Sequence, residues 1–232
     1  MEHIGIVAAM DEEMNAIKEL MVNVNEHTYY GRTFLLGDIL DKEVILVKAG
    51  VGKVNAASVT QLLIDKFDVD SVINVGSAGA INYDLSYGDI VISTKLVQHD
   101  FDITCFEHEK GYITGIGREI EADEKLIDVF EKAINNVDSG IRVVKGVIAT
   151  GDQFLNDTDV KKEIRKEFNA ECGEMEGAAV AQVCKLCDVP FIVIRSISDK
   201  PNSNEPIDFY NYLEMASKNC AKIVKEVMGI LN

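Results

Sequence analysis

Proline, basic residues and long hydrophobic runs are scarce in this sequence. Only three of its 232 residues are proline, and no stretch is of low complexity or rich in Ser and Gly. Because nothing marks a linker, we expect residues 1–232 to form one domain with a sizeable buried core. Although 47% of the residues are hydrophobic, no run of them is long enough to span a bilayer.

The shortage of basic residues argues against nucleic acid as a partner. The chain has 23 Lys and Arg but 39 Asp and Glu, which gives a formal net charge of −16. Binding to a phosphate backbone requires clusters of basic side chains. The first residues, MEHIGIVAAMDEE, also lack the basic segment and the cleavage pattern of a secretory signal. We therefore expect a cytoplasmic protein that binds a small molecule or another protein.

Cysteine and histidine are too scattered for a disulfide framework or a metal site. Five cysteines, an odd number, stand at positions 105, 172, 184, 187 and 220, and reduced thiols are expected. Cys184 and Cys187 lack a second pair for zinc, so packing within an apolar helix is favoured. The four histidines show no ligand spacing, and His99 either lines a pocket or is a hydrogen-bonded structural residue.

Apolar strands alternate with helical patterns along the chain. Strands are expected at 4–9, 44–50, 71–80, 88–94, 146–152 and 189–199, and helices at 55–67, 122–135, 177–187 and 209–230. The strands are apolar on both faces, which is typical of a sheet covered by helices on both sides. The pattern therefore predicts an α/β fold.

Small and polar residues follow several of these strands. The segments VGSAGA, ATGDQF and RSISD place Gly, Ser or Asp where an apolar strand ends, and ligands of open α/β sheets bind at this edge. The turn KAGVGKVN resembles a phosphate-binding loop, but Asn55 replaces the third glycine of the dinucleotide motif and Val54 follows Lys53. A tight turn from strand to helix is therefore favoured over a nucleotide-phosphate cradle.

Glu13 is the acidic residue of the first helix that is best placed to reach this edge. Met10, Met14, Ile17 and Met21 form the apolar stripe of that helix, and Glu13 lies on its inward side. A catalytic role competes with a simpler one, in which the carboxylate stabilises the positive N-terminus of the helix.

Glu174 and Glu176 stand at the head of the segment GEMEGAAVAQV. On a helix, residues two positions apart point in roughly opposite directions, so we expect one of the two to approach the interior. A buried carboxylate needs a hydrogen-bond donor or a ligand, and the hydroxyls of a sugar diol would suit it. Stabilisation of the helix N-terminus is the alternative.

Arg195 and Asp199 lie near the end of the most apolar strand, in VIRSISDK. An arginine in such a strand requires a carboxylate partner, so these residues form either a structural ion pair or part of a site. Together with Glu13 and Glu176, they could supply a base, a diol holder, an orienting cation and an acid.

The order of the motifs along the whole chain points to a known family. They are IGIVAAMDEE, AGVGKVNAA, VGSAGA, ATGDQFL, GEMEGAAVAQV and RSISD. In this order they resemble the bacterial 5′-methylthioadenosine/S-adenosylhomocysteine nucleosidases of the nucleoside phosphorylase superfamily. The resemblance implies a single-domain three-layer sandwich with a central twisted mixed β-sheet flanked by helices. It also implies hydrolysis of the N-glycosidic bond of both nucleosides, and of 5′-deoxyadenosine, to adenine and a 5-substituted ribose in methionine salvage.

The resemblance also assigns roles to residues of this sequence. Glu13 is similar to the general base that activates water, and Arg195 to the residue that helps hold that site. Asp199 resembles the acid that donates to the imidazole ring of adenine. The expected substrate-binding residues are Ser77 near the water and sugar, Phe154, Leu155 and Ser198 around adenine, Met175 and Glu176 at the ribose, Glu174 in a secondary role, and Phe209 at the 5′ substituent.

The resemblance implies a homodimer and neither a metal nor an organic cofactor. The segment YITGIGREIEADEKL departs from the family pattern in the 111–121 loop, where a neighbouring subunit closes the 5′ pocket, so the preferred 5′ substituent stays open. A purine nucleoside phosphorylase is one alternative, but it needs a cationic phosphate site, for which Lys53 is the only nearby candidate. A hydrolase of another purine nucleoside such as futalosine, or a non-catalytic nucleoside-binding protein, are the others.

Overall fold

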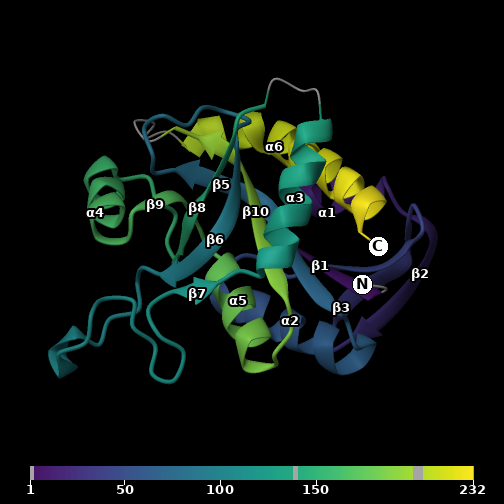
Figure 1. Ribbon diagram of the computed structural model, residues 1–232, viewed down its shortest axis with the longest axis horizontal. Coiled ribbons are helices and arrows are strands. Elements are labelled where there is room, and N and C mark those ends of the chain that lie inside the picture. The colour runs from purple at the N-terminus through teal and green to yellow at the C-terminus, as the bar shows by residue number, and fades with distance from the viewer. Residues whose placement is uncertain (1–2, 138–140, 201–205, 232) are drawn as a thin grey trace.

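The computed structural model describes residues 3–137, 141–200 and 206–231, without the side chains of 206–209. Its strands form one ten-stranded mixed sheet with helices on both faces (Figure 1). In chain order the elements are β1 (His3–Ala8), α1 (Asp11–Lys18), β2 (Val22–Tyr29), β3 (Arg32–Ile39), β4 (Lys42–Lys48), α2 (Lys53–Phe67), β5 (Ser71–Ala80), β6 (Ile90–Gln98), the 3-10 helix η1 (Thr104–Phe106), β7 (Ile120–Glu121), α3 (Glu124–Asn136), β8 (Val143–Thr150), α4 (Thr158–Phe168), β9 (Ala170–Glu174), α5 (Gly177–Leu186), β10 (Phe191–Asp199) and α6 (Pro206–Ile230). The predicted α/β architecture is confirmed.

The sheet is open at one end and closed at the other. Strands β2, β3, β4, β1 and β5 follow one another in space, and β10 then pairs with both β5 and β6. Because β6 pairs with β8, β8 with β9, and β9 with β5, these strands close into a ring. Strands β1, β5 and β10 are parallel, so their carboxyl ends lie at one edge of the sheet.

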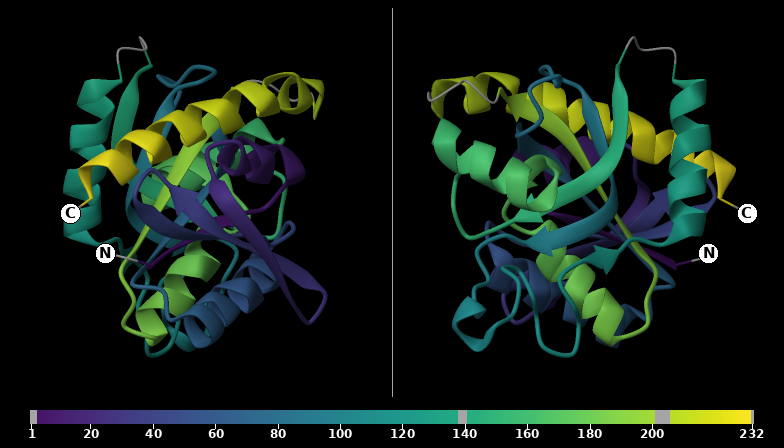
Figure 2. Two further views of the ribbon diagram at one scale, coloured as in Figure 1. Left: turned by 90° about the vertical axis from the view of Figure 1, so that its right-hand side faces the viewer. Right: turned by 60° about the vertical axis from the view of Figure 1, so that its left-hand side comes forward.

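Helices cover both faces of the sheet, as Figure 2 shows from the side. Helices α1, α3 and α6 pack against the side chains of Ile4 and Ile6 on one face, and α2 and α5 pack against Val7 and Val47 on the other. Residues of β1 alternate between the two cores, as expected for a strand buried on both faces. None of the helices in the described ranges is long and apolar enough to cross a membrane.

Local sequence explains where the helices near the site begin. The Asp157 carboxylate caps α4 by accepting hydrogen bonds from the backbone N–H groups of Asp159 (2.8 Å) and Val160 (3.2 Å). The turn before α2 holds Gly50 and Gly52 at φ angles of +85° and +102°, a conformation that other residues adopt only with strain. The interpretation of KAGVGKVN as a tight turn from strand to helix is therefore confirmed.

Candidate active site

A cavity of about 230 Å³ lies where β1, β5, β9 and β10 end. Arg195 is buried beside the cavity, and the side chain of Phe209 lies outside the described residues. All the other predicted site residues are on its wall: Glu13, Ser77, Phe154, Leu155, Glu174, Met175, Glu176, Ser198 and Asp199.

Glu13 is held at the end of β1 by hydrogen bonds that also reach β5. Its Oε2 accepts from the backbone N–H groups of Ala9 (2.9 Å) and Met10 (3.1 Å). Its Oε1 accepts from the backbone N–H (2.9 Å) and the hydroxyl (3.2 Å) of Ser77. Four hydrogen-bond donors therefore hold the two oxygens of this carboxyl group in place. The side chain is only 3% exposed and lines the cavity, as a candidate base should.

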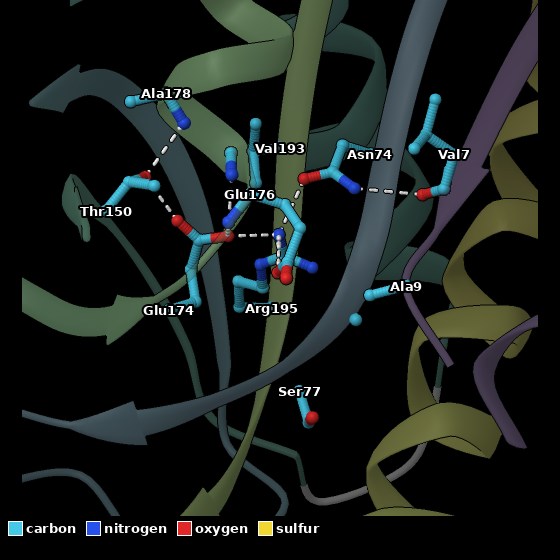
Figure 3. A network of polar contacts seen from close by, with 12 residues as sticks. Val7, Ala9, Asn74, Ser77, Thr150, Glu174, Glu176, Ala178, Val193 and Arg195 are labelled. Carbon is cyan, nitrogen blue, oxygen red and sulfur yellow. Dashed lines mark hydrogen bonds and ion pairs between the residues drawn. The ribbon is translucent and has the colours of Figure 1, made fainter. Parts of the chain in front are cut away.

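Arg195 lies within a network of polar contacts that includes Asn74, Glu174 and Glu176 (Figure 3). Its Nη2 donates to Asn74 Oδ1 (2.6 Å), forms an ion pair with Glu174 and lies 3.7 Å from Glu176 Oε2. Burial by itself would lower the pKa of Arg195, but the carboxylates of Glu174, Glu176 and Glu13 raise it above its ordinary value. The guanidinium is therefore a fixed cation among carboxylates, so the predicted structural ion pair is present, while a role of Arg195 in a site stays a prediction.

Glu174 and Glu176 do not share a helix, so the expectation drawn from helix geometry was wrong. Glu174 ends β9, Glu176 stands at the N-cap position of α5, and both are buried. The Glu174 carboxylate accepts hydrogen bonds from the backbone N–H groups of Glu176 (3.0 Å) and Gly177 (2.7 Å) and from the hydroxyl of Thr150. Glu174 thus satisfies the N-terminus of α5, which was the simpler of the two roles considered.

Glu176 is a cavity carboxylate with a raised pKa. Its Oε1 accepts a hydrogen bond from the backbone N–H of Gly52 (2.9 Å), in the glycine-rich turn. Burial, together with the nearby charge of Glu174, raises its pKa to about 7, although Arg195 acts in the opposite direction. Near neutral pH this group can therefore accept or donate a hydrogen bond, which suits recognition of a diol.

Asp199 lies at the end of β10, close to the strand β5. Its Oδ1 accepts a hydrogen bond from the hydroxyl of Ser198 (3.3 Å), and its Oδ2 lies 3.2 Å from Lys161 Nζ. A Cβ atom on Gly79 would lie only 2.6 Å from Oδ2, so glycine is required there for Asp199 to keep its place. A similar Cβ on Gly76 would lie 2.2 Å from Nη1 of Arg195. The glycines of VGSAGA therefore provide space for the charged side chains of β10.

The remaining wall of the cavity is largely apolar. Phe154 and Leu155 follow β8, and Met175 lies between β9 and α5. Sequence reasoning missed Tyr210, which also lines the cavity, and assigned no role to Gln153, which does so as well. An apolar wall with a few polar groups is typical of sites for small organic ligands.

Lys161 was also missed, although its spacing in the sequence carried a signal. It lies three residues before Ile164 and seven before Phe168, and these three side chains form the buried face of α4. A lysine in the apolar stripe of a helix indicates a buried partner. His99, by contrast, is buried with its ring close to Gly151, and is not among the described residues of the cavity wall.

The charge of the cavity suits a neutral or cationic ligand. Its described wall contains carboxylates but no lysine or arginine side chain. Lys53, the candidate for a phosphate site, is paired with Asp100 at 2.7 Å and lies 3.2 Å from Gln98 Oε1. Among the described residues, no cluster of three or more His, Cys, Asp or Glu side chains is arranged to hold a metal ion. The arrangement places acid–base groups next to an apolar wall, and the Arg195 cation orients the carboxylates of Glu174 and Glu176.

This fold and site belong to a known class. The chain is a member of the Phosphorylase superfamily, whose sequence model matches residues 3–228. It is 42% identical over 226 residues to the 5′-methylthioadenosine/S-adenosylhomocysteine nucleosidase of Bacillus subtilis (strain 168), with 97% of each chain covered. The resemblance inferred from the ordered motifs is therefore confirmed.

Solved structures agree with this assignment. The nucleosidase of the same name from Neisseria meningitidis, in complex with methylthio-immucillin-A, is 34% identical with a TM-score of 0.95, and 100% of each chain is covered. The futalosine hydrolase of Helicobacter pylori strain 26695 is 36% identical with a TM-score of 0.94, covering 99% of this chain and 98% of that one. The predicted fold of the nucleoside phosphorylase and hydrolase type is confirmed.

Proposed function

We propose that this protein is an N-glycosidase that hydrolyses 5′-methylthioadenosine and S-adenosylhomocysteine, and also 5′-deoxyadenosine, to adenine and the 5-substituted ribose. The observation that carries the proposal is that Glu13, Glu176 and Asp199 line one cavity beside an apolar wall. Cleavage leaves positive charge on the sugar and negative charge on the base, so carboxylates around the sugar and an acid at the base favour the transition state.

The proposed reaction assigns one step to each group. The bond between C1′ and N9 breaks, its electron pair goes to adenine, and Asp199 gives a proton to the imidazole ring of the base. Water forms the new bond to C1′, and Glu13 takes the proton that the water loses. Glu176 binds the ribose hydroxyls, while Arg195 holds the carboxylates of Glu174 and Glu176 in place. Phe154 stacks on adenine, Leu155 reads its edge, and Met175 packs on the sugar.

Water is favoured over phosphate as the second substrate because of the charge of the cavity. An anionic phosphate would meet several carboxylates, and no cation is found among the described residues of the wall. Futalosine is a second candidate substrate, because the structure of the futalosine hydrolase of Helicobacter pylori aligns with almost the whole of this chain at a TM-score of 0.94. Both substrates require cleavage of a glycosidic bond to a purine base.

A homodimer in the cytoplasm is part of the same proposal. Val51 and Phe154, which line the cavity, are 48% and 47% exposed in the single chain, and Val54, three residues after Val51 at the start of α2, is 80% exposed; we call these three residues the cavity-rim patch. A second copy seated on this patch would therefore close the site. Burial of these side chains against another subunit would remove apolar surface from water.

Product analysis tests the reaction directly. Purified protein would be incubated with methylthioadenosine, with and without phosphate, and the products separated by chromatography. Adenine and free methylthioribose in both conditions are expected. Adenine that forms only with phosphate, together with a sugar phosphate, would identify a phosphorylase, and cleavage of futalosine alone would identify the second candidate.

Single substitutions then separate catalysis from binding. Glu13→Gln is expected to lower kcat by about 10²–10⁴-fold while substrate binding is retained. Glu12→Gln is the matched control, because Glu12 is exposed and precedes Glu13 in α1. Full activity in the Glu13→Gln variant would contradict its role as base, and the same loss in the control would point to damage to the helix.

A further inference from the structure

Lys161 is a buried lysine that the proposed reaction does not use. It lies on α4, beside β8 and β9 (Figure 1), and its side chain is 0% exposed. An ammonium group without a counter-charge is very costly in the interior of a protein. Its position therefore requires a specific partner.

That partner is the candidate acid. Lys161 Nζ lies 3.2 Å from Asp199 Oδ2 and 3.3 Å from the backbone carbonyl oxygen of Lys200. The other carboxyl oxygen of Asp199 accepts the hydroxyl of Ser198. Gly79 leaves the space in which Oδ2 lies. Lys161 thus fixes the orientation of the Asp199 carboxyl group as well as its electrostatic surroundings.

Two opposing influences act on the proton of Asp199. The residue is only 6% exposed, and burial favours a neutral carboxylic acid. An ammonium group at 3.2 Å favours the ionised carboxylate instead. A general acid works best when it holds its proton near the working pH and still releases it to the leaving group. Burial without Lys161 would give an acid that keeps its proton too firmly.

We propose that Lys161 is a positioning residue for catalysis, whose buried ammonium orients Asp199 and sets how readily this acid releases its proton to the leaving base. The inference rests on the proposed hydrolysis and adds a residue to its machinery. As the proton leaves Asp199, the new carboxylate charge is balanced by the ammonium at 3.2 Å.

Other charged or titratable groups near Lys161 and Asp199 are neutral or contact other groups. Burial, together with nearby charges that include Asp199, raises the pKa of the Cys172 thiol in β9 well above the ordinary value, so this thiol stays neutral. Arg195 of β10 is paired with Glu174. The ammonium of Lys200 lies 5.0 Å from the ring of Tyr87. Lys161 forms an ion pair with Asp199 at 3.2 Å.

The test is the pH dependence of kcat and kcat/KM for Lys161→Met, compared with the wild-type protein. Because Asp199 must be protonated to act as an acid, activity falls as the pH rises through its apparent pKa. Loss of the ammonium should move this alkaline limb upward by about one pH unit or more. It should also lower the plateau kcat by about tenfold, because a weaker acid transfers its proton more slowly.

Lys162→Met is the matched control. Lys162 is the next residue of α4, is exposed, and pairs with Asp159 at 2.8 Å. The control should leave the pH profile unchanged. A second variant, Lys161→Gln, keeps a hydrogen-bond donor without the charge, and it should move the alkaline limb in the same direction as Lys161→Met.

The outcomes separate this inference from the proposed function. If the wild-type protein cleaves methylthioadenosine and the alkaline limb of a folded Lys161 variant stays in place or moves downward, the role of Lys161 is overturned. Thermal unfolding identifies variants that fold, and a merely structural role would lower the melting temperature without moving the limb. If the wild-type protein cleaves no nucleoside, the proposed hydrolysis itself fails.

Discussion

At the scale of single residues, the site is dominated by carboxylates whose environments differ. Glu13 accepts hydrogen bonds from several donors, and Glu174 contacts an arginine and the N-terminus of a helix. Glu176 is buried and lies near another negative charge. Burial and the neighbouring negative charge give ionised Glu176 an electrostatic cost. That cost has a measurable consequence for stability.

Glu176 should make the protein less stable as the pH rises from about 4.5 to about 7. Its pKa is raised from 4.5 to about 7 in the folded state, so over this window the folded state holds a proton that the unfolded state has lost. Unfolding free energy then falls with increasing pH. Glu176→Gln removes this penalty and should be more stable than the wild type by about 1–3 kcal/mol at pH 8, relative to their difference at pH 4.

Denaturant unfolding of the wild type and of Glu176→Gln at several pH values checks this expectation. Glu12→Gln serves as the control, because Glu12 is exposed in α1 and lies outside the cavity wall. A stability difference between wild type and Glu176→Gln that does not change with pH would contradict the raised pKa.

At the scale of elements, the site depends on close packing of β5 against β10. Gly76 and Gly79 stand on β5 opposite the charged side chains of Arg195 and Asp199, and the two strands pair in parallel. A strand with side chains at these positions would push both charged groups out of place. The small residues of β5 are thus as necessary to the site as the charged residues themselves.

Gly79→Ala should lower kcat/KM by about 10²-fold. The new methyl group would lie 2.6 Å from Asp199 Oδ2 and would therefore push the carboxyl group out of place. Gly229→Ala is the control, since its Cβ would meet only Leu40 Cδ1 at an ordinary contact distance of 3.5 Å. Steady-state kinetics and thermal unfolding of both variants provide the measurement. Unchanged activity in Gly79→Ala would show that β5 can move away from Asp199.

Individual strands and helices differ in how well the sequence predicts them. Buried strands such as β1, β5 and β10 were predicted because they are apolar on both faces. The strand β2 was not, because VNVNEHTY is polar and nearly all exposed, and α4 was not, because TDVKKEIRKEF is mostly charged. The strand β9 was not expected, and its last residue Glu174 was placed with Glu176 at the head of a helix, since small apolar residues of α5 follow directly.

Of the site residues, only those that belong to recognisable sequence motifs could be predicted. Glu13, Glu176 and Asp199 each stand at the end of an apolar strand or next to a helix start, so their positions carried a signal. The contact of Lys161 with Asp199 joins residues 38 positions apart, and the space that Gly79 leaves for Asp199 depends on how β5 pairs with β10. Such relations follow from tertiary structure and not from local patterns.

At the scale of the whole molecule, net charge and exposed apolar surface act against each other in assembly. Each chain carries a formal charge of −16, so two copies repel one another at low ionic strength. The cavity-rim patch of Val51, Val54 and Phe154 favours association. Added salt screens the repulsion but leaves the apolar attraction, so it should strengthen a dimer.

Val54→Glu should weaken the dimer and lower kcat/KM in parallel, because Val54 is 80% exposed in the single chain and lies in the rim patch. Sedimentation velocity over a range of protein and salt concentrations, with activity assays on the same samples, provides the measurement. Leu40→Glu is the control, because Leu40 is also exposed, at 55%, but lies on the turn between β3 and β4. A fully active monomer would contradict the proposed role of a second subunit.

The closed end of the sheet has a consequence for the behaviour of the protein in a crowded solution. Because β10 pairs on both sides, the strands of the described chain that have only one partner strand are β2 and the two-residue strand β7. The edge strand β2 bears Asn23, Asn25 and Glu26, and its register is broken between Val22 and Asn25. Polar side chains and a bulge prevent another strand from adding to such an edge. The molecule therefore offers little template for amyloid-like growth, even though most of its strands are strongly apolar.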